Sequence, residues 1–217
     1  MDTRQNSLAK HLKEGVAALE LSLSVAQCNG LLAYVKLLSK WNEVYNLTAV
    51  RDPGEMISHH LLDSLAVIPY IKGPHVLDVG TGAGLPGIPL AIALPRVDFV
   101  LLDSVAKKTR FVLQAASELG LSNVMVKTQR VEKYHPAELF DTVISRAFSS
   151  IAEFINVAGP LCRPGGVLLA MKGRYPEEEL KALPQGYQLR EAVRLAVPGL
   201  DEERHVACLD RYYSYDI

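Results

Sequence analysis

The chain of 217 residues is long enough for one large domain, with or without a smaller appendage. Its hydrophobic fraction of 49% and charged fraction of 22% are typical of a globular protein with a sizeable core. The net charge of −1 argues against a generally basic nucleic-acid-binding protein but permits a local basic patch. The three cysteines form no C-x-x-C pair, and neither a membrane-length apolar stretch nor a signal peptide is present. We therefore expect a cytoplasmic protein that does not act at a membrane.

The first third of the chain has the apolar spacing of helices. A helical stripe covers 7–20, and Ser24 is placed to cap a second helix that ends near Trp41. Asp52, followed by proline and glycine, is a start signal for a third helix. We expect residues 1–72 to form an N-terminal helical extension in which Trp41 packs on the core.

The third predicted helix carries three side chains of metal-binding type, His59, His60 and Asp63. No further ligand follows at the usual spacing for a metal site. We therefore expect these residues to form hydrogen bonds near the helix end, and we expect no metal.

From residue 75 onward, strands alternate with helices. The expected strands cover 75–80, 97–102, 124–126, 140–145, 165–171, 187–197 and 204–209, with helices at 85–94, 105–120, 150–160 and 177–183. The last two strands follow a short link and so form an antiparallel pair. Five parallel strands closed by such a pair predict an α/β fold for residues 73–217. From this pattern we expect the Rossmann-like class I S-adenosylmethionine-dependent methyltransferase fold, with a seven-stranded, mostly parallel sheet.

A glycine-rich turn joins the first of these strands to its helix, within His75–Gly87. Such a turn lets the backbone approach a ligand closely, and the helix behind it offers free N–H groups. Asp103 ends the next strand, and in a parallel sheet it faces the turn. Its carboxylate is then placed to accept hydrogen bonds from both ribose hydroxyls of an adenosine.

Two cofactors fit this turn. Gly82–Gly87 matches G-x-G-x-x-G of nicotinamide enzymes, whereas Asp78 with Gly80–Gly84 matches D-x-G-x-G-x-G of S-adenosylmethionine enzymes. The charge of Asp78 suits a cationic sulfonium or amino group and would repel a pyrophosphate. Too few residues follow Met171 for the further strand and substrate domain of a typical nicotinamide enzyme. The alternative to a role of Asp78 in cofactor binding is a structural one, in which its side chain only caps the turn.

Several motifs together identify a family. They are Tyr45-Asn46-Leu47-Thr48, His60-Leu61-Leu62-Asp63-Ser64, Asp78–Gly87, Leu102-Asp103-Ser104, Arg130-Val131-Glu132, Ser145-Arg146-Ala147 and Met171-Lys172-Gly173. The chain resembles the RsmG (GidB) family of bacterial 16S rRNA guanine-N7 methyltransferases over nearly its whole length. Many methyltransferases share the glycine motif. Its Leu-Pro-Gly ending, with Tyr-Asn-Leu-Thr and Ser-Arg-Ala, is more specific.

The resemblance implies methyl transfer from S-adenosylmethionine to N7 of a single guanosine, with 16S rRNA or a small-subunit particle as partner. It implies donor contacts at Gly80, Leu85, Val131, Glu132 and Arg146, each of which follows a predicted strand end. Guanine N7 has a lone pair and no proton at neutral pH, so the reaction needs no general base. We expect catalysis by positioning, with Arg146 holding the donor carboxylate or the acceptor.

The residues expected at the RNA are Asn46, Lys107, Lys108, Arg110, Arg130, Lys172 and Arg174. The parallel-sheet arrangement brings the six basic ones to or near one edge, although a charge run is most often only a solvated face. Two alternatives remain open. One is a methyltransferase for a small molecule or protein, whose site would be lidded and less basic. The other is an inactive RNA-binding relative, against which the intact glycines and Asp78 argue.

Overall fold

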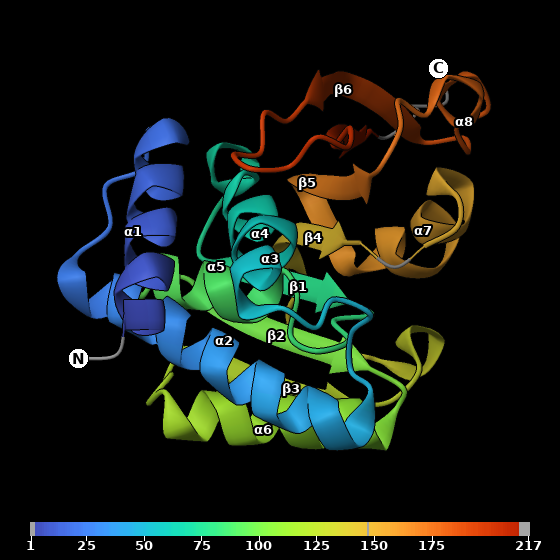
Figure 1. Cartoon of the computed structure of the whole chain (residues 1–217). Coiled ribbons are helices and arrows are strands. Elements are labelled where there is room, and N and C mark those ends of the chain that lie inside the picture. Colours follow the sequence, from blue (N-terminus) through green and yellow to red (C-terminus); the bar gives the residue numbers. More distant parts are fainter. Residues whose placement is uncertain (1–2, 147, 213–217) are drawn as a thin grey trace.

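A seven-stranded sheet runs through the computed structural model, which describes residues 3–146 and 148–212 (Figure 1). The strands are β1 (His75–Val79), β2 (Asp98–Asp103), β3 (Val124–Thr128), β4 (Phe140–Ser145), β5 (Cys162–Lys172), β6 (Tyr187–Arg194) and β7 (His205–Arg211). Their order is β3-β2-β1-β4-β5-β7-β6. The first five are parallel, and β7 runs antiparallel to β5 and β6. The predicted sheet is confirmed.

The order of the strands reverses between β1 and β4. From β1 the chain steps outward to β2 and β3, and then returns to form β4 on the other side of β1. At such a reversal the connections leave the sheet in opposite directions, which opens a crevice beyond the carboxyl ends of the strands. The glycine-rich turn and the residue that follows β4 both lie at this edge.

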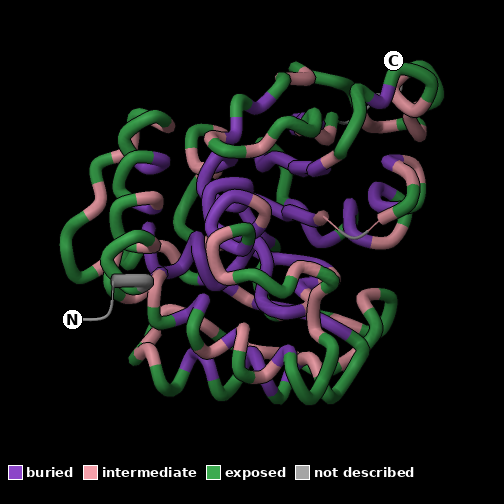
Figure 2. The backbone as a smooth tube through the Cα atoms, in the orientation of Figure 1, coloured by how far each residue is buried: buried purple, intermediate pink, exposed green. Residues whose placement is uncertain are grey.

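Helices cover both faces of the sheet (Figure 1). One face carries α1 (Thr3–Ala18), α2 (Val25–Tyr45), α5 (Gly87–Ala93) and α6 (Ala106–Glu118), and the other carries α7 (Ile151–Ala158) and α8 (Glu177–Lys181). Side chains alternate between the faces, so Val76 and Leu77 belong to different hydrophobic clusters. Figure 2 shows the buried residues concentrated along the central strands and the helices beside them. No described helix is long and apolar enough to span a membrane.

The N-terminal helices share the core of the sheet. Leu12 of α1 and Leu31 of α2 belong to the same buried cluster as Val206 of β7. The predicted cap of α2 is present, because the Gln27 N–H donates to Ser24 Oγ while Gln27 Oε1 accepts from the Ser24 N–H. The Gln27 amide also donates to the Ala93 carbonyl at the end of α5, at 2.8 Å. The helical extension is therefore fastened directly to the sheet domain.

The third predicted helix is not regular along its length. It consists of α3 (Pro53–Met56), the π-helical η1 (Ile57–Leu62) and α4 (Asp63–Leu65), followed by the 3-10 helix η2 (Ile68–Tyr70). Asp52 caps its start as predicted, and Asp52 Oδ1 accepts from the N–H of Gly54 at 2.8 Å. The π-helical turn was not predicted, because the apolar spacing is compatible with an ordinary helix. Turns of this kind are frequent at functional sites.

Candidate active site

The glycine-rich turn is tied to the neighbouring strand through its backbone. The N–H groups of Gly80 and Thr81 both donate to the Leu102 carbonyl, at 2.8 and 3.0 Å. Gly80 and Gly82 have φ values of +71° and +60°, which glycine adopts without steric cost. Gly87 opens α5 so close to β2 that a Cβ there would collide with the Leu101 side chain. The glycines thus permit both the turn and its tight packing.

Asp78 lies beneath this turn and is completely buried. Its Oδ2 accepts from Thr81 Oγ1 at 2.6 Å and from the Gly87 N–H at 2.9 Å. These are the contacts of a capping residue, and they join the two ends of the turn. Burial raises the pKa of Asp78 to about 6, although the hydrogen bonds from Thr81 and Gly87 oppose this shift.

Asp103 ends β2 and holds the turn from the side. Its Oδ2 accepts from the Gly82 N–H at 2.9 Å, and its Oδ1 accepts from the Val105 N–H at 2.8 Å. Each carboxylate oxygen can accept more than one hydrogen bond, so both retain capacity for a ligand.

A cavity of about 440 Å³ opens beside Asp103, between the ends of β1, β2 and β3. We call it the Asp103 cavity. Gly80, Asp103, Val131 and Glu132 line it together, so four of the residues expected at the donor meet in one place. Val131 and Glu132 belong to a short 3-10 helix, η3 (Val131–Lys133). The cavity is of the size that binds small molecules.

A smaller hollow of about 180 Å³ continues from Gly80 along the other side of the turn. We call it the Arg146 hollow. Gly82, Leu85 and Arg146 line it together with Thr48, which follows α2. The remaining residues expected at the donor are therefore divided: Gly82, Leu85 and Arg146 face this hollow, and Asp78 lies under the turn without lining either space.

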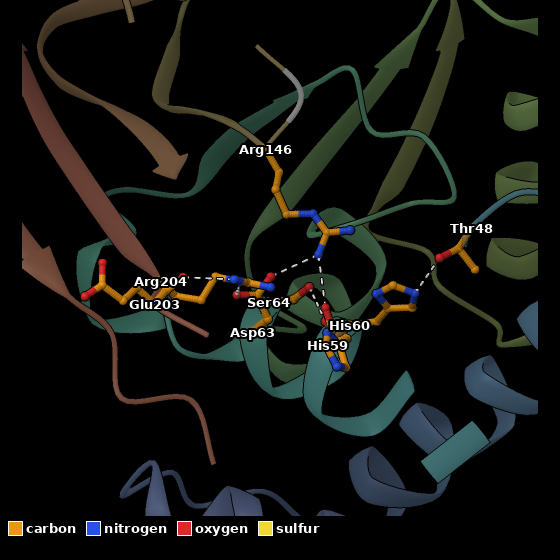
Figure 3. Close-up of polar contacts among 8 residues, drawn as sticks. All are labelled: Thr48, His59, His60, Asp63, Ser64, Arg146, Glu203 and Arg204. Atoms are coloured by element: carbon orange, nitrogen blue, oxygen red, sulfur yellow. Dashed lines mark hydrogen bonds and ion pairs between the residues drawn. The ribbon is translucent and has the colours of Figure 1, made fainter. Parts of the chain in front are cut away.

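Arg146 follows β4 and is held by a buried carboxylate. Its Nη1 lies 2.9 Å from Asp63 Oδ2 and donates to the His59 carbonyl at 3.3 Å. Asp63 is only 1% exposed, and its other oxygen lies 3.3 Å from Nε of Arg204. Figure 3 shows Asp63 between the two arginines. Asp63 therefore balances arginines from two distant parts of the chain.

His60 lies beside this cluster, in the π-helical turn. Its Nε2 is 2.8 Å from Thr48 Oγ1, whereas its buried Nδ1 has no hydrogen-bond partner among the described residues. Burial lowers the pKa of His60 to about 4, and the positive charge of Arg146 acts in the same direction. The imidazole is therefore neutral at physiological pH. Within residues 3–146 and 148–212, no group of His, Cys, Asp and Glu is arranged to hold a metal ion.

Asp78 and His60 give opposite pH dependences of stability. The pKa of Asp78 is raised on folding. Its contribution to the free energy of unfolding is therefore fully present below about pH 4 and is lost as the pH rises to about 6. The pKa of His60 is lowered, so its contribution is present above about pH 6.5 and is lost as the pH falls to about 4. Each pKa shift corresponds to a change on the order of 3 kcal/mol in the free energy of unfolding. In the wild type, the two opposite changes of unfolding free energy with pH should largely cancel.

We expect Asp78→Asn to gain stability relative to wild type as the pH rises from 4 to 6, because only the His60 slope remains. His60→Gln should lose stability over the same range. Urea unfolding at half-unit pH steps measures both slopes. Two variants that follow the wild-type curve would show that neither group titrates as its burial requires.

The basic residues expected at the RNA all follow carboxyl ends of strands, but their environments differ. Lys108 and Arg130 line the Asp103 cavity, and Arg110 and Arg174 are exposed. Lys107 Nζ donates to the Tyr45 carbonyl at 3.4 Å, which attaches the start of α6 to the end of α2. These cations therefore differ in their exposure and in the groups that they contact.

Two further residues expected at the RNA, besides Lys107, have partners within the chain. Lys172 Nζ lies 3.0 Å from Glu179 Oε2 and donates to the Ser149 carbonyl, and its side chain is only 13% exposed. Lys172 lies at the predicted edge, where helix α8 brings an acid against it. Asn46 is the left-handed C-cap of α2, and its Oδ1 accepts from Arg51.

Four residues that position the site were not assigned to it from the sequence. The buried Tyr34 hydroxyl donates to the Ala83 carbonyl at 2.7 Å and supports the turn from below. Asn42 Oδ1 accepts from the Thr48 N–H at 2.9 Å, which fixes the segment after α2. Ser145 Oγ donates to the Val79 carbonyl at 2.7 Å. The fourth is Arg204. A polar residue on an otherwise apolar face is the only sequence signal for Tyr34 and Asn42.

Comparisons with known proteins agree with this geometry. Residues 27–207 match the family described as GidB, rRNA small subunit methyltransferase G. The chain is 54% identical over 198 residues to the ribosomal RNA small subunit methyltransferase G of Nitrosococcus oceani, which covers 91% of this chain and 92% of the relative.

Two solved structures illustrate the fold. The N-methyltransferase NodS from Bradyrhizobium japonicum WM9 superposes with a TM-score of 0.53 at 16% identity, covering 71% of this chain and 95% of that one. M. jannaschii TYW2, solved in complex with AdoMet, gives a TM-score of 0.54 at 17% identity, covering 69% and 74%.

The fold is therefore that of a Rossmann-like class I S-adenosylmethionine-dependent methyltransferase, as predicted from the strand pattern. Within this class, the chain belongs to the rRNA small subunit methyltransferase G (GidB, RsmG) family. The resemblance deduced from the motifs is thus confirmed.

Proposed function

We propose that the protein transfers a methyl group from S-adenosylmethionine to N7 of a single guanosine in bacterial 16S rRNA. Family membership supports the enzyme class and the type of RNA. The observation that carries the proposal is the Asp103 cavity. Its buried carboxylate is fixed by two backbone N–H groups beside an open glycine turn, and such a carboxylate fits the ribose of an adenosine.

The lining residues suggest how the donor is held. Asp103 accepts from the ribose hydroxyls, and Val131 and Glu132 contact the adenine edge in the Asp103 cavity. The methionine part extends past Gly80 into the Arg146 hollow, where Leu85 packs against it. When bound, the sulfonium supplies an electrophilic methyl group. Asp78 acts from beneath the turn by keeping Gly87 and Thr81 in place, and its charge favours a cation nearby.

The acceptor needs placement and not deprotonation, because guanine N7 already presents a lone pair. The groups beside the Arg146 hollow fit this requirement, since His60 is neutral and Arg146 cannot act as a base. Nε and Nη2 of Arg146 have no partner among the described residues, so they are free to hold the donor carboxylate or guanine O6. Catalysis then comes from in-line positioning and from a site that tolerates positive charge on the base.

RNA binding is assigned to the carboxyl edge of the sheet. Lys107, Lys108, Arg110, Arg130 and Arg174 are available there for phosphates, with Asn46 beside the Arg146 hollow. Lys172 joins them only if its ion pair with Glu179 opens. The partner is naked 16S rRNA or a small-subunit particle, and the site of action is the cytoplasm, where ribosomal RNA is found.

Two measurements test this function. Calorimetry should show binding of S-adenosylmethionine or its demethylated product and no binding of NADH. The enzyme should methylate 16S rRNA from a strain that lacks its gene, and cleavage at N7-methylguanosine should map one position. Tight NADH binding without a response to the sulfonium compound would overturn the donor assignment. Methylation of a small molecule or protein, with 16S rRNA unmodified, would overturn the acceptor assignment.

A further inference from the structure

A third cavity, of about 400 Å³, lies on the far side of Arg146. We call it the Arg204 cavity. His60, Asp63, Arg146, Lys172, Arg204 and His205 line it. It shares Arg146 with the Arg146 hollow and has no lining residue in common with the Asp103 cavity. The Arg204 cavity is therefore further from the expected donor site than the Arg146 hollow is.

The charges around this cavity leave a single net positive charge. Arg146 and Arg204 share the one carboxylate of Asp63, and Lys172 is neutralised by Glu179. Arg204 uses Nε for Asp63 and Nη1 for the Glu203 carbonyl, so its Nη2 has no partner among the described residues. One cation with a free N–H edge matches the single negative charge of a phosphodiester.

A buried nitrogen also faces this region. His60 is 5% exposed and its Nδ1 has no hydrogen-bond partner within the described part of the chain. Figure 3 shows the ring edge opposite Thr48 turned toward the Arg146 guanidinium. Buried polar atoms are nearly always paired in folded proteins, so an unpaired one at a cavity wall is a position where a water or a ligand atom would bind. A neutral imidazole is suited to the polar edge of a base.

We propose that the Arg204 cavity holds the nucleotide adjacent to the acceptor guanosine, with its phosphodiester against Arg204 and its base edge against Nδ1 of His60. This inference rests on the proposed function and names a second RNA subsite for it. The acceptor itself must reach the methyl group beside Gly80, and the Arg204 cavity does not extend there. Proteins that recognise RNA loops commonly bind splayed-out bases in this way, through base edges and side-chain planes.

A matched pair of substitutions at His60 tests the base contact. In His60→Gln the amide takes the place of Nε2, so the Thr48 contact is kept and the Nδ1 contact is lost. In His60→Asn the amide takes the place of Nδ1, and the Thr48 contact is lost. We expect His60→Gln to raise the KM for a 16S rRNA fragment roughly five- to tenfold, the loss of about one hydrogen bond, with unchanged donor affinity. His60→Asn should lower the melting temperature more and raise the KM less. The reverse ranking would mean that His60 is purely structural and would overturn the assignment.

The phosphate contact is tested through salt dependence, with RNA binding measured in the absence of donor. Arg204→Ala should lower the salt slope of binding by about 0.7 to 0.9, the value for one lost phosphate contact. Arg204→Lys should restore much of it. Arg96→Ala is the matched control, because Arg96 is exposed at the opposite edge of the sheet. Equal slopes for Arg204→Ala and Arg96→Ala would overturn the subsite.

The two experiments distinguish an error in the RNA subsite from an error in the proposed function. If the wild type methylates 16S rRNA but the variants at His60 and Arg204 behave as controls, only the subsite is wrong. If the wild type binds this RNA through Arg204 without methylating it, the subsite stands and the proposed reaction is wrong.

Discussion

Replacing Asp103 by alanine is expected to lower the affinity for S-adenosylmethionine by a hundredfold or more. Two charge-assisted hydrogen bonds to a ribose contribute about 1.5–3 kcal/mol each, and every 1.4 kcal/mol corresponds to roughly tenfold in affinity. The substitution also leaves the N–H groups of Gly82 and Val105 without their acceptor, which loosens the turn. The fold should survive, because Asp103 lies at the end of its strand, where water can replace the lost contacts.

Calorimetry on Asp103→Ala measures this loss. Asp98→Ala is the matched control, because Asp98 opens the same strand at the opposite edge and is exposed. It should bind the donor as the wild type does. Wild-type affinity in Asp103→Ala would show that Asp103 serves only the turn, and the ribose would have to be placed elsewhere.

Gly87→Ala is expected to abolish donor binding at practical concentrations. The added methyl would collide with the Leu101 side chain and lie 2.8 Å from Asp78 Oδ2, the atom that accepts from the Gly87 N–H. Overpacking of this kind costs about 1–3 kcal/mol in the folded state. Relief requires α5 to move away from β2, and this displaces the glycine turn that faces the donor.

Thermal unfolding measures the stability of Gly87→Ala, and titration with S-adenosylmethionine measures its donor affinity. Gly30→Ala is its control: a Cβ there would meet Ile92 at an ordinary 3.4 Å, and alanine is the better helix former in α2. That variant should be at least as stable as the wild type and bind normally. A Gly87→Ala protein with an unchanged melting temperature and donor affinity would show that the close packing of α5 on β2 is dispensable.

Sequence patterns predicted the part of the site that is local in the chain. The strand before Gly80 and the acid at the end of the next strand lie next to each other in any parallel sheet, so the contact between Asp103 and Gly82 follows from the pattern. The capping of α2 by Ser24 follows equally from neighbouring residues. Short-range signals were therefore sufficient to locate the Asp103 cavity.

Contacts between distant segments could not be predicted in the same way. Asp63 pairs with Arg146 and Arg204 because the start of α4, the end of β4 and the approach to β7 converge, and periodicity carries no information about such convergence. The ion pair of Lys172 was not predicted for the same reason, since its partner Glu179 lies on α8, a separate element of the chain. Tyr34 resembled an ordinary core residue until the position of Ala83 was known.

The position of β7 between β5 and β6 has a consequence for synthesis on the ribosome. β6 leaves the ribosome before β7, yet among the described strands β7 is its only neighbour in the sheet. Until β7 emerges, the edge of β5 stays open with its apolar residues, and such an edge invites pairing with another chain. We expect Arg204, which directly precedes β7 and lies 3.3 Å from Asp63, to reach Asp63 only when β7 is in place. We therefore expect the sheet to close, and Asp63 to gain its second arginine, in a single late step of folding during synthesis.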